Sequence, residues 1–464
     1  MGMVREPAIR ITATRLPLIE VEPGGKLPPL PKSAWLEIDL DAIVSNVRLL
    51  RGIVPAGVRV EPVVKADAYG HGAVAVARAL IADGAASLGV ATFDEALELR
   101  QAGVEVPILI LFPIPADQAP AALRLGLSIT GGDRELLART LAALDEAPRD
   151  APGAVPDRIA VHLEIETGLG RGGVQPEEAA ESAAAIEASP RARLAGVWSH
   201  LQSGGDAAIT AGQETRFGDA SRLLEAACVT VPTRHIVASG ALLAATSGTY
   251  DVVRAGIAMY GMVPDGLVEA ENATSVVARL RPAMALRARP VRVAWLEAGT
   301  GVSYGPSFVT ARRSCIATLP LGYADGYARG LSNKARVLVR GLRVPQVGTV
   351  AMDAIMVDVT DVPGPPITID DEFTLLGEQG EDRITAFEVA QWGNTISHEV
   401  IAAMSGRLPR VYYAAAEAVG MRAVAWDAGR WAGSLDDRRA SSAGTVRPAA
   451  SVRSTSDEIG EHRT

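Results

Sequence analysis

The stretch Val63–Gly72 reads Val-Val-Lys-Ala-Asp-Ala-Tyr-Gly-His-Gly. An apolar run starts at Val58, and Lys65 follows it at the position where a strand should end. A turn flanked by glycines then precedes the next helix. Lysine and arginine together number 45, yet lysine is confined to Lys26, Lys32, Lys65 and Lys334. Because a guanidinium does not deprotonate and attack an aldehyde, Lys65 is a candidate for Schiff-base chemistry. A side chain that reaches from the strand end to solvent is the alternative.

The composition is that of an ordinary folded protein of about two to three domains. With 464 residues, 48% of them apolar, the chain can bury large cores, and its net charge of -9 argues against a nucleic-acid partner. Cys228 and Cys315 cannot form a disulfide framework and lack metal or redox spacing. Residues 1–20 lack the apolar core and cleavage site of a signal peptide, and no apolar run could span a bilayer. We therefore expect a cytoplasmic protein without a membrane partner.

From residue 34 onward, apolar strands alternate with helical patterns. After a strand at 34–38 and a helix that ends before Pro55, short apolar strands recur with Ala-rich helical segments between most of them. This α/β alternation predicts a (β/α)8 TIM-like barrel over residues 34–275, with a doubly wound open sheet as the alternative. The expected barrel strands are 58–64, 86–91, 106–112, 127–130, 158–165, 194–199, 234–238 and 252–257.

The pattern of the sequence changes after about residue 275. Short strands separated by Gly, Pro and Asp turns predict a C-terminal β-rich domain over residues 276–426, with one helix near 386–395. We expect its strands at 291–295, 314–319, 335–339, 354–359 and 372–376. Residues 1–33, rich in proline and glycine, are expected to be an irregular extension. Residues 427–464, which lack apolar periodicity, are expected to be a disordered tail.

The residues that close the barrel strands are the candidate site, because the active site of such a barrel lies at the carboxyl ends of its strands. They are Lys65 and Tyr69 after the first strand, Arg171 after the fifth, His200 after the sixth, Ser239 and Gly240 after the seventh, and Arg254 and Gly256 in the eighth. Barrels usually bind phosphate at the last two strand ends. A single glycine or histidine here would be a turn or a structural residue. A lysine, a phosphate cradle and a cation on one rim together describe a pyridoxal phosphate pocket.

The chain resembles the alanine racemases, fold-type III pyridoxal phosphate enzymes, in motifs that follow one another in family order. Two of them lie in the predicted barrel, namely Lys-Ala-Asp-Ala-Tyr-Gly-His-Gly (65–72) and Thr-Gly-Leu-Gly-Arg (167–171). The others are Arg-Ala-Gly-Ile-Ala-Met-Tyr-Gly (254–261), Val-Ser-Tyr-Gly (302–305), Gly-Tyr-Ala-Asp-Gly (322–326) and Gly-Thr-Val-Ala-Met-Asp (348–353). The resemblance covers residues 34–426. It implies a homodimeric isomerase that interconverts L-alanine and D-alanine with pyridoxal 5'-phosphate and supplies D-alanine for peptidoglycan.

The resemblance also implies a two-base reaction. Lys65 would hold the cofactor and act as the base on one face of the substrate α-carbon, and Tyr304 of the partner subunit would act on the other face. A phenol is a poor base at neutral pH unless positive charge lies beside it, and the family places a histidine linked to an arginine there, here His200 and Arg254. Arg254 would donate a hydrogen bond to the pyridine nitrogen without transferring its proton, which limits transamination.

The remaining roles follow from the same resemblance. Arg171 would contact the phenolic oxygen of the cofactor and the substrate carboxylate. The backbone amides of two further residues of the partner subunit, Met352 and Asp353, would place that carboxylate. The cofactor phosphate would be held by Tyr69, Ser239, Gly256 and Ile257.

Three positions depart from the family pattern. Glu164 stands where some members carry a carbamylated lysine, and we expect its carboxylate to steer Arg171 in the same way, with a solvated acid as the alternative. Ala238 replaces an asparagine of many members, which removes one side-chain contact from the cofactor rim. Gly406 replaces a tyrosine that in some members touches the phosphate, which leaves more of that contact to Tyr69.

Three other interpretations remain. A racemase of broader specificity, acting on serine or basic amino acids, would share the fold, although such relatives tend to be exported. A decarboxylase of the same fold type would place a carboxylate opposite the pyridine nitrogen. A non-enzymatic pyridoxal phosphate carrier would resemble only the first domain.

Overall fold

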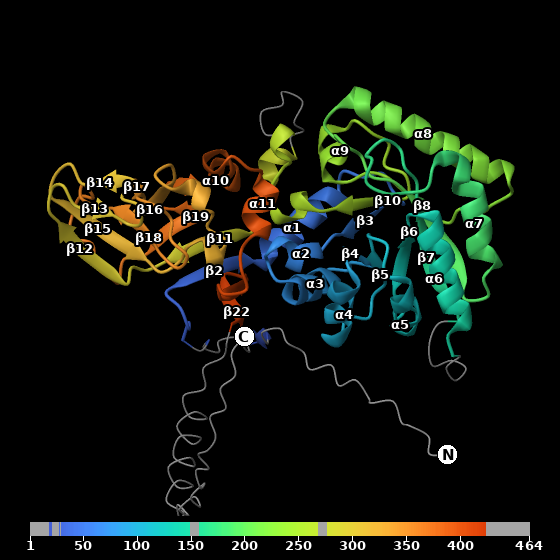
Figure 1. Ribbon diagram of the computed structural model, residues 1–464, viewed down its shortest axis with the longest axis horizontal. Coiled ribbons are helices and arrows are strands. Elements are labelled where there is room, and N and C mark those ends of the chain that lie inside the picture. Colours follow the sequence, from blue (N-terminus) through green and yellow to red (C-terminus); the bar gives the residue numbers. More distant parts are fainter. Residues whose placement is uncertain (1–17, 21–26, 28, 149–156, 268–275, 424–464) are drawn as a thin grey trace, which may run out of the picture. The chain divides into compact units, whose positions relative to one another are not determined.

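The computed structural model describes residues 18–20, 27, 29–148, 157–267 and 276–423. Within this part, parallel strands form a barrel (Figure 1), and each overlaps a run that the sequence predicts as a strand. The barrel strands are β3 (Arg59–Pro62), β4 (Leu88–Val90), β5 (Ile108–Ile110), β6 (Ser128–Gly131), β7 (Ile159–Glu164), β8 (Ala192–Trp198), β9 (Arg234–His235) and β10 (Val252–Ala255).

The barrel closes through isolated bridges as well as through its ladders. Strands β4 to β9 form one parallel sheet in sequence order, and β10 pairs in parallel with β3. A bridge between Val63 and Gly89 joins β3 to β4, and a bridge between Ala238 and Arg254 joins β9 to β10. The strands therefore run around a closed circle, which confirms the predicted barrel over the open doubly wound sheet.

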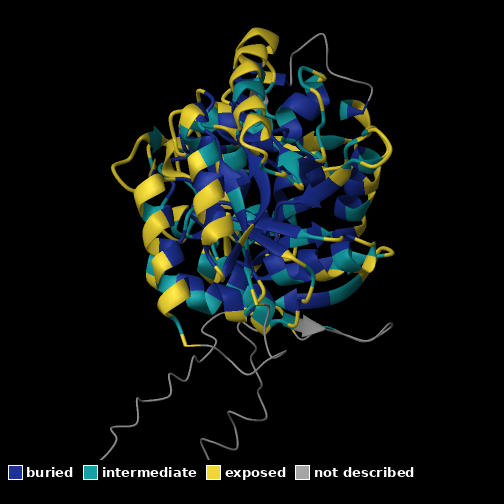
Figure 2. Ribbon diagram, turned by 90° about the vertical axis from the view of Figure 1, so that its right-hand side faces the viewer, coloured by how far each residue is buried: buried dark blue, intermediate teal, exposed yellow. Residues whose placement is uncertain are grey.

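Helices cover the outside of the barrel, so its strands are buried on both faces and consist largely of apolar residues. Figure 2 shows these buried strands surrounded by helices whose outer sides are exposed. The helices are α1 (Leu40–Arg51), α3 (Ala73–Ala82), α4 (Phe93–Gln101), α5 (Ala119–Arg124), α6 (Arg134–Glu146), α7 (Ala179–Ala188), α8 (Ala207–Ala226) and α9 (Ser239–Ala244), followed by the 3-10 helix η3 (Ile257–Tyr260). The segment labelled α2 (Lys65–Tyr69) is a turn with positive φ angles between β3 and α3.

A 12-stranded sheet forms most of the second half of the chain, which confirms the predicted β-rich fold. Its order is β1-β22-β21-β2-β11-β19-β16-β17-β18-β15-β12, and β20 pairs with β19. The strands are β1 (Leu18–Glu20), β2 (Ala34–Asp39), β11 (Met284–Ala288), β12 (Arg292–Leu296), β15 (Ser314–Leu319), β16 (Arg336–Val339), β17 (Leu342–Val347), β18 (Ile355–Asp358), β19 (Phe373–Gln379), β20 (Asp382–Ile384), β21 (Arg410–Ala414) and β22 (Glu417–Arg422). The hairpin of β13 (Gly301–Val302) and β14 (Phe308–Val309) and the helices α10 (Ala386–Gly393) and α11 (Ser397–Ala402) complete this part.

Strand β2 precedes the barrel in the sequence but pairs in the β-rich sheet. It lies parallel to β21 and antiparallel to β11. The chain therefore leaves this sheet at the start of α1, where the Asp39 side chain caps the helix by accepting a hydrogen bond from Ala42 N at 2.8 Å. Contacts join the sheet and the barrel into one compact unit. The domain ranges 34–275 and 276–426 stay our proposal.

The two predicted irregular ends are only partly covered by the described residues. Within residues 1–33, β1 pairs antiparallel with β22, and Lys32 Nζ lies 2.5 Å from Asp325 Oδ1. The expected tail, residues 427–464, lies outside the described residues. In the part of the chain that the structure covers, no helix combines the length and apolarity needed to cross a bilayer.

Candidate active site

Lys65 lies at the carboxyl end of β3, in a turn of unusual backbone conformation. The φ angles of residues 66–69 lie between 51° and 55°. This left-handed region costs L-residues about 1–2 kcal/mol each. Glu95 Oε1 accepts a hydrogen bond from the first amide of the turn at 2.6 Å, and Arg422 NH1 donates to Asp67 Oδ1 at 2.7 Å. These contacts from α4 and β22 fix the backbone from which Lys65 projects.

The Lys65 amine lies where its charge is disfavoured. Burial lowers its pKa and Arg171 and Arg254 lower it further, while Glu95 acts in the opposite direction. A lower pKa increases the fraction of neutral amine, which is the form that attacks an aldehyde. The environment therefore fits a reactive lysine better than one directed to solvent.

Ser239, Tyr69 and Gly256 meet beside the ends of β9 and β10. Ser239 Oγ accepts hydrogen bonds from Gly256 N at 3.1 Å and from Ala258 N at 3.3 Å. Burial raises the pKa of Tyr69 to about 12, and Glu95 adds to the effect, so the phenol keeps its proton and can donate to an anion. Because Ser239 Oγ accepts from both amides, its own proton is left to donate, and a hydroxyl and a protonated phenol at one place match the needs of a phosphate group. The residues present therefore fit the phosphate of the cofactor.

Replacing Gly256 with alanine should weaken cofactor binding. The added Cβ would lie 2.7 Å from Tyr69 Oη, so the phenol would have to move out of the cradle. Overpacking of this kind costs about 1–3 kcal/mol. The cofactor dissociation constant, measured by absorbance after dialysis, should rise accordingly. Gly212→Ala is the control, because a Cβ there meets nothing within 4 Å and should leave the constant unchanged.

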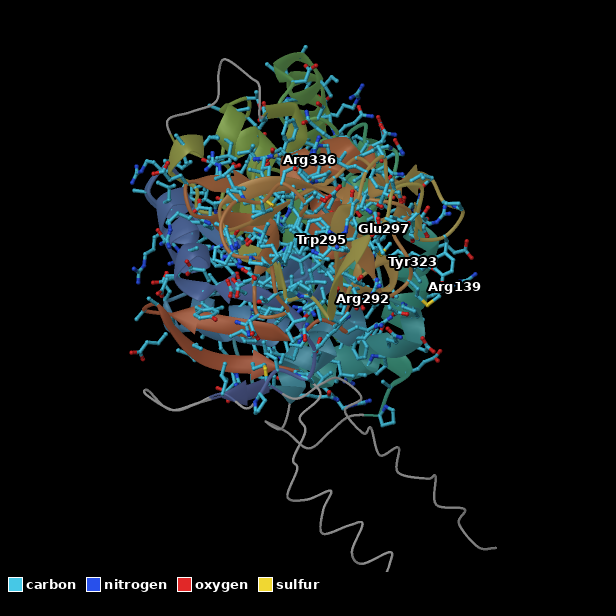
Figure 3. The ribbon with its side chains drawn as sticks, turned by 90° about the vertical axis from the view of Figure 1, so that its left-hand side faces the viewer. Arg139, Arg292, Trp295, Glu297, Tyr323 and Arg336 are labelled. Carbon is cyan, nitrogen blue, oxygen red and sulfur yellow. The ribbon has the colours of Figure 1, made fainter. Side chains whose placement is uncertain are left out.

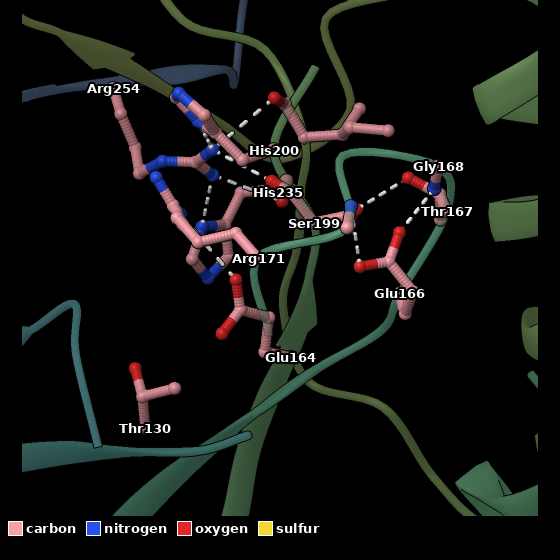
Figure 4. Close-up of polar contacts among 12 residues, drawn as sticks. Thr130, Glu164, Glu166, Thr167, Gly168, Arg171, Ser199, His200, His235 and Arg254 are labelled. Atoms are coloured by element: carbon pink, nitrogen blue, oxygen red, sulfur yellow. Dashed lines mark hydrogen bonds and ion pairs between the residues drawn. The ribbon is translucent and has the colours of Figure 1, made fainter. Parts of the chain in front are cut away.

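Arg254 in β10 is buried inside the barrel, and Figure 4 shows its guanidinium between two histidines. Its NH1 donates to His235 Nδ1 at 2.7 Å, and its NH2 donates to Ser199 O at 2.8 Å. The guanidinium carbon also lies over the Trp198 ring, 4.9 Å from its centroid. Burial lowers the pKa of Arg254 to about 10, so the group still carries its charge at neutral pH. The structure thus holds Arg254 as a hydrogen-bond donor that keeps its proton.

His200 lies just beyond β8, and its Nδ1 is 3.3 Å from Arg254 NH2. Burial lowers the pKa of His200 to about 3, and the charges of Arg254, Arg171 and Lys65 add to the effect. The ring is therefore neutral at pH 7. Because Nδ1 faces a guanidinium donor, the proton of the neutral ring belongs on Nε2. The positive charge of the predicted His200 and Arg254 pair accordingly lies on Arg254.

Glu164 ends β7 and is buried beneath Arg171 (Figure 4). Its Oε1 lies 3.5 Å from Arg171 NH2. On its other side Arg171 stacks over the Phe112 ring, 5.0 Å from the centroid. Burial raises the pKa of Glu164, and Arg171 opposes that shift. A carboxylate and an aromatic ring therefore hold the guanidinium on the barrel rim. This arrangement favours the steering carboxylate over a solvated acid.

The residues of the β-rich part that the resemblance assigns to the site lie apart from this rim. Tyr304 is 75% exposed, and Met352 is also exposed. Asp353 pairs with Arg407, and Figure 3 shows Tyr323 among the exposed side chains of the β-rich part. Among the described residues, no hydrogen bond or ion pair joins Tyr304, Met352 or Asp353 to the rim of its own barrel. The structure thus brings together the barrel residues of the predicted site and leaves these three outside.

Sequence reasoning missed Glu95 and His235, which shape the site from outside the quoted motifs. Glu95 has the spacing of a helix capping box, and its Oε2 does accept from Ala91 N at 2.7 Å. The hydrogen bond that its other oxygen accepts from the lysine turn has no signal in the local sequence. His235 ends the short strand β9, and its sequence does not distinguish it from a structural histidine. At Gly406, an added Cβ would meet nothing within 4 Å.

Comparisons with known proteins agree with this geometry. The family model for the alanine racemase N-terminal domain matches residues 38–264, and the model for the C-terminal domain matches residues 283–412. An alanine racemase of Symbiobacterium thermophilum is 41% identical over 383 residues, covering 82% of this chain and 97% of the relative. One from Nostoc is 39% identical and covers 82% of this chain and 95% of the relative.

Solved structures point the same way. Alanine racemase from the D-cycloserine producer Streptomyces lavendulae has a TM-score of 0.74 at 36% identity, covering 83% of this chain and 98% of that one. Alanine racemase from Bacillus anthracis with bound L-Ala-P has a TM-score of 0.76 at 31% identity, covering 85% and 98%. Both domains match, which disfavours the carrier and decarboxylase interpretations. The chain therefore belongs to the alanine racemase family, whose isomerases interconvert L-alanine and D-alanine with pyridoxal phosphate.

Proposed function

We propose that this protein racemises alanine with Lys65 of one subunit and Tyr304 of a second copy as the two acid-base groups. One observation carries the proposal. Lys65 is half-buried on the barrel rim and its pKa is lowered, whereas Tyr304 is 75% exposed and, among the described residues, forms no hydrogen bond or ion pair with the rim of its own chain. A site that needs both groups is completed when a homodimer places the exposed tyrosine over the rim of its partner.

The chemistry divides among residues of this chain. When bound, pyridoxal phosphate supplies an electron-withdrawing ring that stabilises negative charge at the substrate α-carbon. Lys65 Nζ takes or returns the α-proton on one face, and Tyr304 Oη of the partner subunit does so on the other. Arg254, which keeps its proton, would donate to the ring nitrogen and would so moderate the electron demand of the ring.

The remaining residues bind and orient. Arg171 binds the substrate carboxylate through its guanidinium, which suits a carboxylate in shape and charge. The amides of Met352 and Asp353 in the partner subunit complete that contact. Tyr69, Ser239, Gly256 and Ile257 would hold the phosphate, and His200 supports Arg254 as a neutral ring.

The test of this function is direct. Purified protein should bind the cofactor, detected by its visible absorbance, and should form D-alanine from L-alanine in a stereospecific assay. Serine and arginine, offered at equal concentration, should react more slowly. A protein that binds the cofactor but forms no D-alanine would overturn the proposal.

We also propose that the enzyme is cytoplasmic and supplies D-alanine for cell-wall peptidoglycan. The support is the family product, D-alanine, and the resemblance to enzymes with that role. Cell fractionation with immunodetection tests the location. Dependence of growth on added D-alanine after gene deletion tests the supply.

Replacing Glu164 with glutamine should raise KM for alanine and leave kcat nearly unchanged. The substitution removes the charge that steers Arg171 toward the substrate carboxylate. Because Arg171 is partly exposed, such a pair contributes about 0–1 kcal/mol, so we expect KM to rise by up to about fivefold. Steady-state kinetics checks this, with the exposed Glu177→Gln as the control. Identical KM values would contradict a steering role.

The same pair gives a pH dependence. Because burial raises the pKa of Glu164, its negative charge is lost at a less acidic pH than for an ordinary glutamate. In the unaltered protein, the charge is present above that pKa and is lost as the pH falls through it. KM should therefore rise on acidification, and this rise should be smaller in Glu164→Gln.

A further inference from the structure

A cavity of about 260 Å³ opens at the amino ends of the barrel strands, away from the rim that carries Lys65. Its lining comes from the beginnings of successive strands, so it lies along the barrel axis. Arg59 begins β3, Ser128 begins β6, and Val252 begins β10. None of the roles derived above uses this cavity.

Several hydrogen-bond donors line the cavity. The guanidinium groups of Arg59 and Arg193 are exposed, and within the described residues neither forms an ion pair or a side-chain hydrogen bond. Ser128 also lines the cavity. Two cations without partners at the mouth of a cavity provide the fork-shaped donors that bind carboxylates and phosphates.

Two histidines connect the cavity with Arg254. Arg254 NH1 lies 2.7 Å from His235 Nδ1, and His235 Nε2 lies 2.9 Å from His162 Nδ1. A guanidinium can only donate, so His235 Nδ1 accepts, and the proton of the neutral ring is on Nε2. His162 Nδ1 must then accept as well, which leaves its proton on Nε2, available to the cavity that His162 lines. The chain of donors therefore runs from Arg254 to the cavity.

We propose that this cavity binds a small oxyanion, either a phosphate or a carboxylate group, and that the two imidazoles transmit its presence to Arg254. The anion would accept from Arg59, Arg193 and His162 Nε2. By accepting a hydrogen bond from His162, the anion would make His162 Nδ1 and then His235 Nδ1 better acceptors. The hydrogen bond from Arg254 to His235 would therefore become stronger. The link to the cofactor ring rests on the proposed role of Arg254, whereas binding of the anion does not.

The lining contains one acid, Glu61, against the two arginines. Glu61 Oε2 accepts a hydrogen bond from Ser87 Oγ at 2.8 Å, while Oε1 is buried without a partner among the described residues. Burial raises the pKa of Glu61, while the Ser87 hydrogen bond and the charges of Arg254 and Arg59 oppose that shift. Burial lowers the pKa of His162 to about 4, so that ring stays a neutral donor at pH 7. The charge balance of the cavity is therefore positive.

Calorimetric titration of the cofactor-loaded full chain with sodium phosphate tests the site. Ionic strength is held constant with sodium chloride. An equilibrated, saturating mixture of L-alanine and D-alanine occupies the substrate site on the rim. We expect saturable binding of one anion per chain. The double variant Arg59→Gln, Arg193→Gln should weaken it by about tenfold or more. The double variant Arg292→Gln, Arg336→Gln is the matched control. Both arginines are exposed, each is the first residue of a strand (Figure 3), and neither forms an ion pair among the described residues.

The remaining outcomes are decisive. Acetate in a parallel titration distinguishes the sources: saturation by phosphate alone assigns a phosphate group, and saturation by acetate assigns a carboxylate. No saturable heat with either anion, or equal affinity in the arginine variant, overturns the site.

Saturating phosphate should shift the cofactor absorbance in the unaltered protein and not in the arginine variant, and an unshifted band overturns the link to Arg254. Loss of racemisation leaves the calorimetric result unaffected, so the two proposals fail separately.

Discussion

Replacing Lys65 with alanine should lower racemisation by about 10⁴-fold or more. A proton-transfer group alone contributes about 10²–10⁴-fold, and this change also removes the amine that anchors the cofactor. D-alanine formation from L-alanine measures the loss, and the absorbance of the protein reports cofactor attachment. Lys65→Arg should fail as well, because a guanidinium does not deprotonate at neutral pH.

Lys334→Ala is the matched control for Lys65→Ala. Lys334 is exposed in the β-rich part, so its loss should change neither activity nor absorbance. Circular dichroism should show that both variants stay folded. Lys65→Ala protein that racemises alanine nearly as fast as the unaltered enzyme would contradict the assignment.

Replacing Tyr304 with phenylalanine should lower racemisation by about 10²–10⁴-fold, because one proton-transfer group is lost while the ring remains. Tyr304 is 75% exposed in its own chain, so folding and cofactor binding should be retained. Stopped-time D-alanine assays and the absorbance spectrum measure the two effects separately. Tyr413→Phe, in β21, is the control and should keep full activity. Equal activity of both variants would remove Tyr304 from the reaction.

The barrel could be predicted because its signal is local. Apolar strands buried on both faces read as continuous runs, and helices between them fix the alternation. The barrel part of the site could also be predicted, because the carboxyl ends of parallel strands converge on one rim. Tyr69 is distant in sequence from Ser239 and Gly256, yet the closed circle of strands brings these three together, and burial supports the reactive role of Lys65.

Features that depend on distant partners could not be predicted. The left-handed turn at residues 66–69 contradicts the local preference of alanine for right-handed helix, and Arg422 supports it from 355 residues away. Strand β2 has a strand pattern, but no local feature says that it pairs with β21. The predicted strands do not include β17, which contains Pro345, a residue without an amide proton for a strand ladder.

The same limit applies to the polar interior of the barrel. His162 and His235 lie on different strands, 73 residues apart, and each reads as an isolated structural histidine. Their hydrogen bond becomes visible only when β7, β8 and β9 are placed side by side. The cavity below them has no sequence signal for the same reason, since each strand contributes a single lining residue or two.

The central claim is that each active site combines Lys65 of one chain with Tyr304 of another, and mixing two inactive variants tests it most directly. Lys65→Ala and Tyr304→Phe chains are combined in equal amounts, dissociated and reassociated. Mixed dimers then contain one site with both groups intact and one with neither. Racemisation should recover to about a quarter of the unaltered level, since half of the dimers are mixed and each has one working site. Activity that stays at the level of the separate variants would contradict a site shared between two chains.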